Sequence, residues 1–296
     1  MLQSIKNKLQ TYLDVIIPQQ IDNNVQFSER IKNRHKIFWK ALYAERVRNK
    51  TMLATDSMRK WKNVKNWQRK LSNKFNSREF AKKHGCKVAE LYWKGRNCNS
   101  IDFDNLPDQY VIRPTMGHSL GLVFLINNST NLMDGKRYSK EDIRQVLAKA
   151  LYENEKLEFL IEEFLKTEDG MYQIPADYKF YMFNGQIASI QVINRLNSSE
   201  ASNSWYDENW NPMMNLTSNY SRGTVQKSPE CLTEMIEYAR KLSKAYEIFV
   251  RIDFYATDKG AVFGEFTPTP AFGKGFTPAG DKLLADYWDR FCKGKV

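Results

Sequence analysis

The chain reads Val250-Arg-Ile-Asp-Phe254 and, beyond a turn, Phe263-Gly-Glu-Phe-Thr-Pro-Thr-Pro270, and these two segments decide the fold. Both alternate apolar with polar residues, which is the pattern of strands that have one buried face. Asp258-Lys259-Gly260 lies between them and is typical of a tight turn. The sequence therefore predicts an antiparallel hairpin, because a connection this short cannot hold a crossover helix.

This hairpin would bring two carboxylates together. Residues two apart share a face of a strand, so Arg251 projects with Asp253, and Glu265 projects with Thr267. Pairing across the turn places Asp253 near Glu265, and neighbouring carboxylates raise each other's pKa unless a cation lies between them. Mg²⁺ suits such a pair, since it takes one or two carboxylates and completes its shell with phosphate oxygens. The alternative is an exposed Arg–Asp pair with an unrelated Glu at a sheet edge.

The segments around the hairpin predict a mixed α+β fold with antiparallel sheets. We expect strands at residues 88–93, 110–113, 122–126, 159–165, 179–183, 187–193, 248–256 and 261–266. Asn184-Gly185 predicts a second hairpin. Helical patterns cover residues 2–16, 28–48, 76–84, 139–154 and 229–246, with Asn76 or Ser77 capping the third. Helices and strands do not alternate strictly, which argues against a doubly wound nucleotide-binding fold.

A polar loop between two of these strands reads Arg113-Pro-Thr-Met-Gly117-His118-Ser119-Leu-Gly121. A strand that ends in a cation and enters a small, glycine-bearing loop can close backbone N–H groups over phosphate oxygens while Arg113 neutralises them. The loop lacks the GxxxxGK[ST] spacing of a P-loop. The simpler interpretation is a plain hairpin.

A third polar segment reads Glu162-Glu163-Phe164-Leu165 and is followed by Asp177 and Lys179. An apolar strand that runs into a linker can offer main-chain groups to an adenine edge and a carboxylate to ribose hydroxyls. Lys179 is a compact charge that suits a phosphate. The alternative is that the acids only solvate the end of a strand.

Charge is divided unevenly along the chain. The 296 residues carry a net charge of +11, but residues 1–100 hold 23 Lys and Arg against 7 Asp and Glu, so the remainder is mildly acidic. A basic segment on an acidic body suggests a face that meets a polyanion or anionic lipid. This segment contains four tryptophans, namely Trp39, Trp61, Trp67 and Trp93. In a nucleic-acid-binding protein they would stack on bases, but the simpler interpretation is that they anchor the hydrophobic core. We therefore expect no nucleic-acid partner.

Composition places the chain among cytoplasmic proteins. Its mean hydropathy is −0.60, and no apolar run approaches the length of a membrane span. The first residues lack the apolar core and cleavage site of a secretory signal. The 4 cysteines form no CxxC pair, which disfavours a zinc site and a disulfide framework. We expect a soluble protein of the reducing cytoplasm, at most peripheral at the inner membrane face.

Together these segments resemble the ATP-grasp superfamily and, within it, the branch of teichuronopeptide and other polysaccharide biosynthesis. Five motifs carry the resemblance in order: a strand-cation-glycine loop at 113–121, an EE-aromatic-L strand at 162–165, a DYKF…FNG hairpin at 177–185, a DxxW segment at 207–210, and an RxDFY…GExTxxP ending at 251–270. The resemblance implies antiparallel sheets with flanking helices and a nucleotide cleft between two subdomains.

The resemblance also divides the chain. We expect a basic helical N-terminal region at 1–68, the N-terminal and central part of the ATP-grasp fold at 69–105, a small subdomain with the glycine loop at 106–166, and a C-terminal subdomain with the metal site at 167–296.

The resemblance assigns an ATP-binding set to this chain. Lys74 matches the lysine of a DKxxxRE segment, whose Asp is Asn73 here, and would contact phosphate. The whole implied set is Lys74, Arg113, Gly117, His118, Ser119, Gly121, Glu162, Glu163, Phe164, Leu165, Asp177 and Lys179. The glycine loop resembles a flap over the nucleotide.

The resemblance assigns the metal ligands and the catalytic residues as well. Asp253 and Glu265 match the two Mg²⁺ carboxylates, and Arg251 matches the cation that steadies the reacting phosphoryl group. Thr267, the third metal candidate, stands where other carboxylate-amine ligases carry Asn, and a hydroxyl is the poorer ligand. Arg195 is our second catalytic candidate, to hold an acidic acceptor, with surface solvation as its alternative.

The implied reaction is formation of an acyl phosphate from a carboxylate and ATP, followed by attack of an amine to give an amide. ATP and two Mg²⁺ ions would be the cofactors, and an amino acid or other amine would be the donor. A uronic acid or similar carboxylate of a capsular or cell-surface polysaccharide would be the acceptor, and residues 1–100 would contact an anionic membrane or glycan. The alternatives are a phosphotransferase that acts on a sugar hydroxyl and a non-catalytic polyanion-binding protein.

Overall fold

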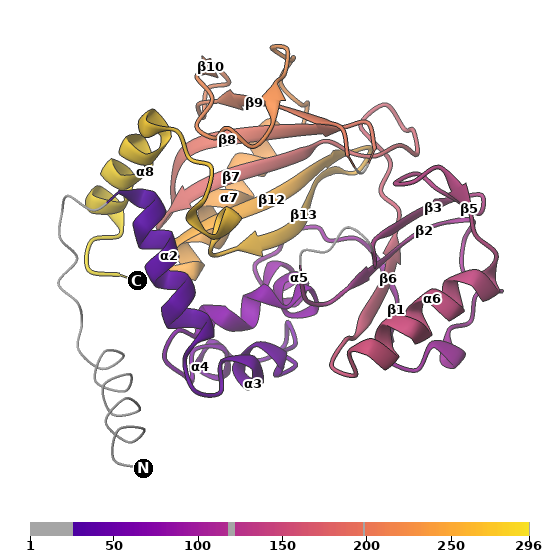
Figure 1. Ribbon diagram of the computed structural model, residues 1–296. Helices are drawn as coiled ribbons and strands as arrows, with labels where there is room; N and C mark the ends of the chain where they lie inside the picture. The colour runs from indigo at the N-terminus through magenta and orange to yellow at the C-terminus, as the bar shows by residue number, and fades with distance from the viewer. Residues whose placement is uncertain (1–25, 118–121, 198, 296) are drawn as a thin grey trace.

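The computed structural model describes residues 26–117, 122–197 and 199–295, and Figure 1 shows two β-sheets with helices packed on them. The smaller sheet has the order β1-β6-β2-β3-β4-β5. Its strands are β1 (Leu91–Gly95), β2 (Gln109–Pro114), β3 (Phe124–Asn127), β4 (Thr130–Asn131), β5 (Lys136–Arg137) and β6 (Phe159–Glu163). All of its pairs are antiparallel.

The larger sheet has the order β10-β9-β8-β7-β12-β13, with β11 paired to β9. Its strands are β7 (Asp177–Phe183), β8 (Gln186–Arg195), β9 (Ala201–Tyr206), β10 (Pro212–Met213), β11 (Ser221–Arg222), β12 (Phe249–Thr257) and β13 (Gly260–Thr267). Pairing is antiparallel except between β11 and β9. The predicted hairpins at Asn184-Gly185 and Asp258–Gly260 are therefore confirmed.

Helices pack on both faces of the larger sheet and on the smaller sheet. They are α2 (Phe27–Trp39), α3 (Ala44–Asn49), α4 (Met58–Trp61), η1 (Trp67–Ser72), α5 (Lys74–Lys83), η2 (Cys98–Ser100), α6 (Lys140–Glu153), α7 (Leu232–Tyr246), η4 (Pro270–Gly273) and α8 (Pro278–Phe291). One core cluster joins the sheet to α7 and α5, and another joins its opposite face to α2 and α8. Helix α6 packs on the smaller sheet.

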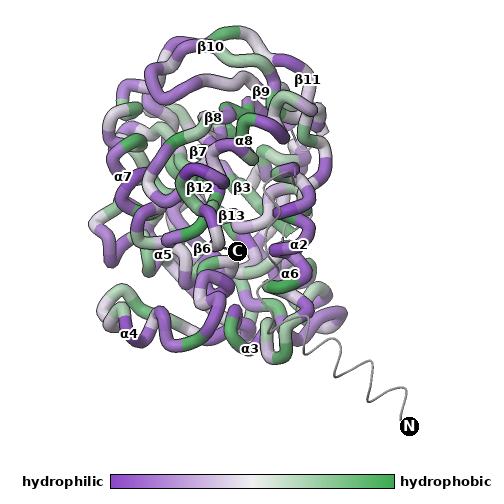
Figure 2. Tube along the Cα trace, turned by 90° about the vertical axis from the view of Figure 1, so that its left-hand side faces the viewer, coloured by the Kyte–Doolittle hydropathy of each residue, from purple (hydrophilic) through white to green (hydrophobic). Residues whose placement is uncertain are grey.

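Strand alternation separates core side chains from polar ones. In β12, Val250 and Ile252 belong to the core under α7, so Arg251 and Asp253 lie on the opposite face. In β2, Ile112 belongs to the core under α6, so Arg113 faces away from that helix. These charged side chains are thus left for the site, and Figure 2 shows hydrophobic and hydrophilic residues interspersed along the chain.

The described part of residues 1–100 packs against the hydrophobic cores of the two sheets. Trp61 and Trp67 are buried, and Trp39 and Trp93 pack against core clusters, which agrees with their expected role as core anchors. None of the helices in the described ranges is long and apolar enough to cross a membrane.

Several sequence-based boundaries were wrong. The helix expected at 28–48 is split into α2 and α3, because Tyr43 adopts the left-handed conformation (φ 62°). The helix expected at 76–84 begins at residue 74, since the side chain of Asn73, and not that of Asn76 or Ser77, accepts the N–H bonds of its first turn. Helix α8 was not expected, and the helix predicted at 2–16 lies outside the described residues.

Candidate functional site

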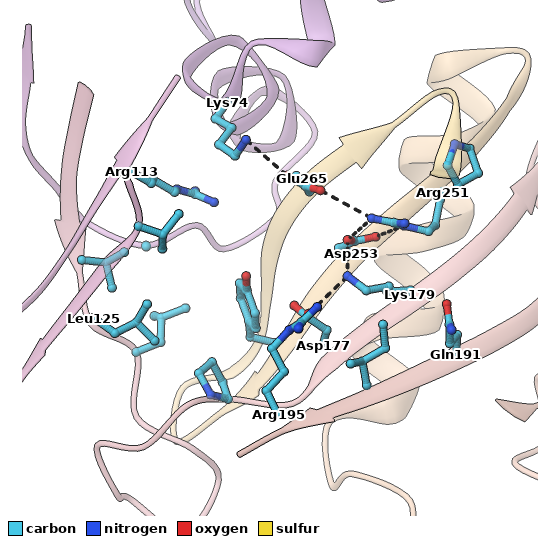
Figure 3. Close-up of a pocket in the computed structure, with 18 of the residues that line it drawn as sticks. Lys74, Arg113, Leu125, Asp177, Lys179, Gln191, Arg195, Arg251, Asp253 and Glu265 are labelled. Carbon is cyan, nitrogen blue, oxygen red and sulfur yellow. Dashed lines mark hydrogen bonds and ion pairs between the residues drawn. The ribbon is translucent and has the colours of Figure 1, made fainter. Parts of the chain in front are cut away.

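A cavity of about 450 Å³ lies between the polar faces of the two sheets. It is lined by residues of β2 and β6 on one side and of β7, β8, β12 and β13 on the other. Figure 3 shows the charged side chains that point into it from these strands and from α5.

The two predicted metal carboxylates face each other across the β12–β13 hairpin. The Cα atoms of Asp253 and Glu265 are direct partners in the strand register, as the alternation predicted. A bulge follows, with Gly264 as the extra residue, and a Cβ there would lie 3.0 Å from the Asp253 carbonyl oxygen. The close approach of the two backbones favours glycine at this position.

Asp253 is 2% exposed and is held by two cations. Arg251 donates from Nε to Oδ1 at 2.7 Å and from Nη2 to Oδ2 at 2.6 Å, while Lys179 Nζ donates to Oδ2 at 2.7 Å. Burial lowers the pKa of the Arg251 guanidinium, but Asp253 raises it more, so Arg251 stays charged. Arg251 is thus a fixed cation beside the Asp253 side chain.

Glu265 is surrounded by cations from three elements. Its Oε2 lies 3.6 Å from Lys74 Nζ of α5, and its Oε1 lies 3.5 Å from Arg251 Nη2 and accepts from the Thr267 hydroxyl at 3.1 Å. Burial raises the pKa of Glu265, but Lys74, Arg251 and Lys179 outweigh it and lower the pKa to about 2. A carboxylate in this field is always ionised near neutral pH.

The smaller sheet contributes a second charged cluster. Arg113 Nε donates to Glu162 Oε2 at 2.6 Å, and Arg78 Nε lies 3.3 Å from Glu162 Oε1. Glu162 is thus buried between two guanidinium groups and orients Arg113 toward the cavity (Figure 3). Sequence reasoning missed Arg78 as a site residue, although it lies one helical turn after Lys74 and in the same quoted segment.

The predicted adenine-lining residues lie at the cavity as well. Glu163, Phe164 and Leu165 line it together with the apolar side chains of Val111 and Leu125. The carboxylate of Glu163 also accepts from the Glu90 backbone N–H at 3.1 Å and pairs with Lys259.

The far end of the cavity carries Asp177 and Arg195. Asp177 Oδ2 lies 3.3 Å from Lys179 Nζ and 3.9 Å from Arg195 Nε. Arg195 Nη2 also donates to the Tyr220 hydroxyl at 3.1 Å. Arg195 therefore lines the cavity as a cation, and its one carboxylate contact among the residues that the structure describes is long.

Most of the predicted site residues therefore meet in one place. The cavity is lined by Lys74, Arg113, Gly117, Glu162, Glu163, Phe164, Leu165, Asp177, Lys179, Arg195, Arg251, Asp253 and Glu265. Thr267 does not line the cavity itself and contacts two residues that do, Arg251 Nη2 at 2.9 Å and Glu265 Oε1 at 3.1 Å. His118, Ser119 and Gly121 lie outside the described residues. Sequence reasoning missed Tyr181 and Tyr255, although each lies two residues beyond a predicted site residue on the same strand face.

The oxygen donors of this site fit Mg²⁺. Two carboxyl groups and a hydroxyl are hard oxygen ligands of the kind that Mg²⁺ takes, and the cations around them show that positive charge is accommodated here. Among the described residues no group of three or more His, Cys, Asp or Glu side chains could hold an ion. Bound Mg²⁺ would therefore need further oxygen ligands, which a triphosphate has.

Comparison with solved structures finds ATP-grasp ligases. One is D-alanine–D-alanine ligase from Bacillus anthracis complexed with ATP, with 15% identity and a TM-score of 0.49 over 76% of this chain and 65% of that chain. Another is the ATP-grasp ligase PsnB complexed with its minimal precursor, with 11% identity and a TM-score of 0.43 over 73% and 60%. L-amino acid ligase from Bacillus licheniformis has 13% identity and a TM-score of 0.42 over 67% and 43%. This chain thus spans less than two thirds of the length of each.

No curated protein sequence matches the chain significantly. The sequence profile of the TupA-like ATPgrasp family, in contrast, matches residues 54–289 and so includes every site residue described above. Because this match covers well over half of the sequence, the chain belongs to the TupA-like ATPgrasp family.

Proposed function

We propose that this ATP-grasp ligase joins a carboxylate to an amine with ATP, through an acyl phosphate. The carboxylate would belong to a uronic acid or similar group of a capsular or cell-surface polysaccharide, and the amine to an amino acid or another amine. The observation that carries the proposal is the facing pair Asp253 and Glu265, ringed by cations in a cavity of nucleotide-accommodating size.

Charge neutralisation is the main task of the side chains in this reaction. A triphosphate and an attacking carboxylate repel each other, and the barrier falls where fixed cations meet the charge that develops. Arg113, held by Glu162, and Lys74, at the start of α5, both line the cavity and would bind phosphate oxygens. Mg²⁺ held by Asp253 and Glu265 would supply further neutralisation when bound.

Arg251 is the proposed catalytic cation. Its guanidinium is fixed by two hydrogen bonds to Asp253, so it can face a reacting phosphoryl group without reorganising. The scheme needs no covalent enzyme intermediate, since the acyl phosphate forms directly from ATP.

Arg195 is the proposed site for the acidic acceptor. Its nearest carboxylate contact, to Asp177, measures 3.9 Å, and its neighbour Tyr220 is a neutral hydroxyl. A guanidinium with one long ion pair retains donors for a second carboxylate. We further propose two Mg²⁺ ions per site and a cytoplasmic location, peripheral at the inner membrane face through residues 1–100.

Product analysis tests this function. We expect ATP, a uronic-acid glycan and an amino acid to give inorganic phosphate, ADP and a new amide, found by mass spectrometry over a panel of donors and acceptors. A stable phosphorylated sugar would instead establish the phosphotransferase. No ATP turnover with any member of the panel would favour the non-catalytic polyanion-binding protein.

A further inference from the structure

A second cavity, of about 810 Å³, lies in the N-terminal helical region between α3 and η1. We call it the basic pocket: its cations are Arg46 and Lys50 on one side and Lys65, Arg69 and Lys70 on the other. No Asp or Glu is found among the described residues that line it. It is separate from the cavity between the sheets, with which it shares no lining residue.

Two of the pocket's cations are buried and form no ion pair with an acid in the described part of the chain. Lys70 is 1% exposed, and its ammonium donates to the backbone oxygens of Lys60 and Trp61 at 2.9 and 2.7 Å. Arg69 is also buried and donates to the backbone oxygens of Lys65 and Asn66 at 3.0 and 3.2 Å. Burial, together with Lys50 and Lys60 and against Asp56, lowers the pKa of Lys70 to about 8, which indicates a positive field in the pocket.

Three more cations stand exposed at the rim. Arg46, Lys50 and Lys65 form no ion pair with any residue that the structure describes. The acid on the same short helix, Glu45, is already paired with Arg48 at 3.7 Å and Lys156 at 3.1 Å. The rim is therefore free to bind an anion from outside the molecule.

Apolar side chains stand beside these cations. Leu42 is 67% exposed and Tyr43 is 65% exposed, and both line the basic pocket. Figure 1 shows α3 at the opposite end of the molecule from β9 and β10, and Figure 2 shows hydrophilic and hydrophobic residues side by side around α3 and α4. An aromatic ring and a leucine next to lysines suit the interface of a lipid bilayer, where apolar side chains meet the acyl chains and cations meet the headgroups.

We propose that the basic pocket binds the phosphate of an anionic phospholipid headgroup at a bilayer surface, with Leu42 and Tyr43 entering the interface. A soluble polyanion would satisfy the cations equally well, but it would leave Leu42 in water. This makes the peripheral contact of the proposed function specific to α3 and η1. It is independent of the ligase reaction, because a binding measurement needs neither ATP nor acceptor.

Vesicle binding of the full chain tests the proposal. The wild type should bind vesicles of phosphatidylcholine with phosphatidylglycerol and should not bind phosphatidylcholine alone. Near an anionic surface each Lys or Arg contributes about fivefold to binding. The triple variant Arg46→Gln/Lys50→Gln/Lys65→Gln should therefore bind about a hundredfold more weakly. These side chains are exposed, so folding should be kept, which the thermal midpoint checks.

Two further variants separate the possible sources of binding. The charge-matched control Lys136→Gln/Arg137→Gln/Arg222→Gln removes three exposed cations of β5 and β11 and should weaken binding only severalfold. Leu42→Ser/Tyr43→Asn keeps every charge, and Asn tolerates the left-handed backbone of residue 43. It should weaken vesicle binding at least tenfold while leaving binding of soluble polyphosphate unchanged.

Three results would overturn the proposal. The first is that the wild type does not bind the vesicles. The second is that the pocket and control triple variants lose vesicle binding equally. The third is that Leu42→Ser/Tyr43→Asn binds vesicles as well as the wild type, which would identify a site for soluble polyanions instead. Ligase turnover measured in solution should be the same for wild type and pocket variants, so failure here and failure of the proposed reaction are distinguishable.

Discussion

Asp253 and Glu265 share a role in the proposal but not an environment. Asp253 is buried between Arg251 and Lys179, whereas the side chain of Glu265 is 32% exposed and meets Lys74 at 3.6 Å. Removing the first charge takes from Lys179 and Arg251 the buried anion that both contact most closely, while removing the second leaves cations that reach solvent or phosphate. Equal losses of activity should therefore come with unequal losses of stability.

We expect Glu265→Gln to lower Mg²⁺-dependent ATP turnover about a hundredfold or more, with a loss of unfolding free energy of at most about 1 kcal/mol. Asp253→Asn should lower turnover as much but cost about 3 kcal/mol, because it breaks a buried ion pair. Turnover assays and urea unfolding of both variants measure the two effects. Wild-type turnover in both variants would remove the metal assignment.

The pKa of Glu265 predicts a pH dependence of stability. Its folded value is about 2, below the ordinary 4.5, so the ionised form stabilises the folded state. This contribution is complete above the ordinary pKa and is lost as pH falls from there toward about 2. The unfolding free energies of wild type and Glu265→Gln should converge as pH falls through this window, measured by urea titration at several pH values. A constant difference would show that the surrounding cations do not hold this carboxylate.

At the scale of elements, the β12–β13 hairpin carries the two proposed metal ligands. Its register pairs Asp253 with Glu265, and the bulge at Gly264 then shifts the pairing so that Phe254 meets Phe263. The shift returns Phe263 and Phe266 to the core under α7 while Glu265 faces the cavity. One glycine thus reconciles core packing with the position of a ligand.

We expect Gly264→Ala to disturb this register. The new methyl group would lie 3.0 Å from the Asp253 carbonyl oxygen and 3.1 Å from the Tyr255 ring, so these neighbours must shift by a few tenths of an ångström. The variant should lose about 1–2 kcal/mol of stability and most of its ATP turnover, measured by thermal unfolding and phosphate release. Gly135→Ala is the control, because no atom lies within 4 Å of its added Cβ, and only its positive φ costs stability. Loss of turnover in the control as well would mean that general destabilisation is responsible.

At the scale of the whole molecule, the cations are concentrated at two surfaces, the cavity between the sheets and the basic pocket. The cations of the cavity between the sheets are matched by Asp177, Glu162, Asp253 and Glu265, whereas the basic pocket has no acid among its described lining residues. The proposed subdomains at 106–166 and 167–296 contain most of the first surface, and the proposed region at 1–68 contains most of the second.

These surfaces should respond differently to salt. Exposed charges are screened within about 8 Å at physiological ionic strength, whereas buried pairs are screened much less. We expect binding to anionic vesicles to fall steeply with added KCl while the affinity for ATP falls less, measured by vesicle sedimentation and isothermal titration over one salt series. If the affinities for vesicles and for ATP fell equally with salt, both ligands would be bound by exposed charges, which would contradict this prediction.

Local sequence patterns predicted the strands and the ligand pair because they act within a few residues. Alternation along residues 250–254 and 263–267 placed Arg251 with Asp253 and Glu265 with Thr267, and the Asp258–Gly260 turn brought the two carboxylates into register. The same local patterns did not predict α8 or the split between α2 and α3. They also did not identify Asn73 as the N-cap of α5, because Asn76 and Ser77 nearby are polar residues of the same kind.

The sequence by itself determined the α+β class, the antiparallel hairpins and the family, since motif order and side-chain period are local properties of a chain. Only the tertiary structure decided which charges meet. Glu162 of β6 joins Arg113 of β2 to Arg78 of α5, and Lys74 of α5 reaches Glu265 of β13, through contacts between distant segments. The basic pocket likewise depends on the packing of α3 against η1. No spacing encodes these contacts, because they depend on how two sheets and their helices pack.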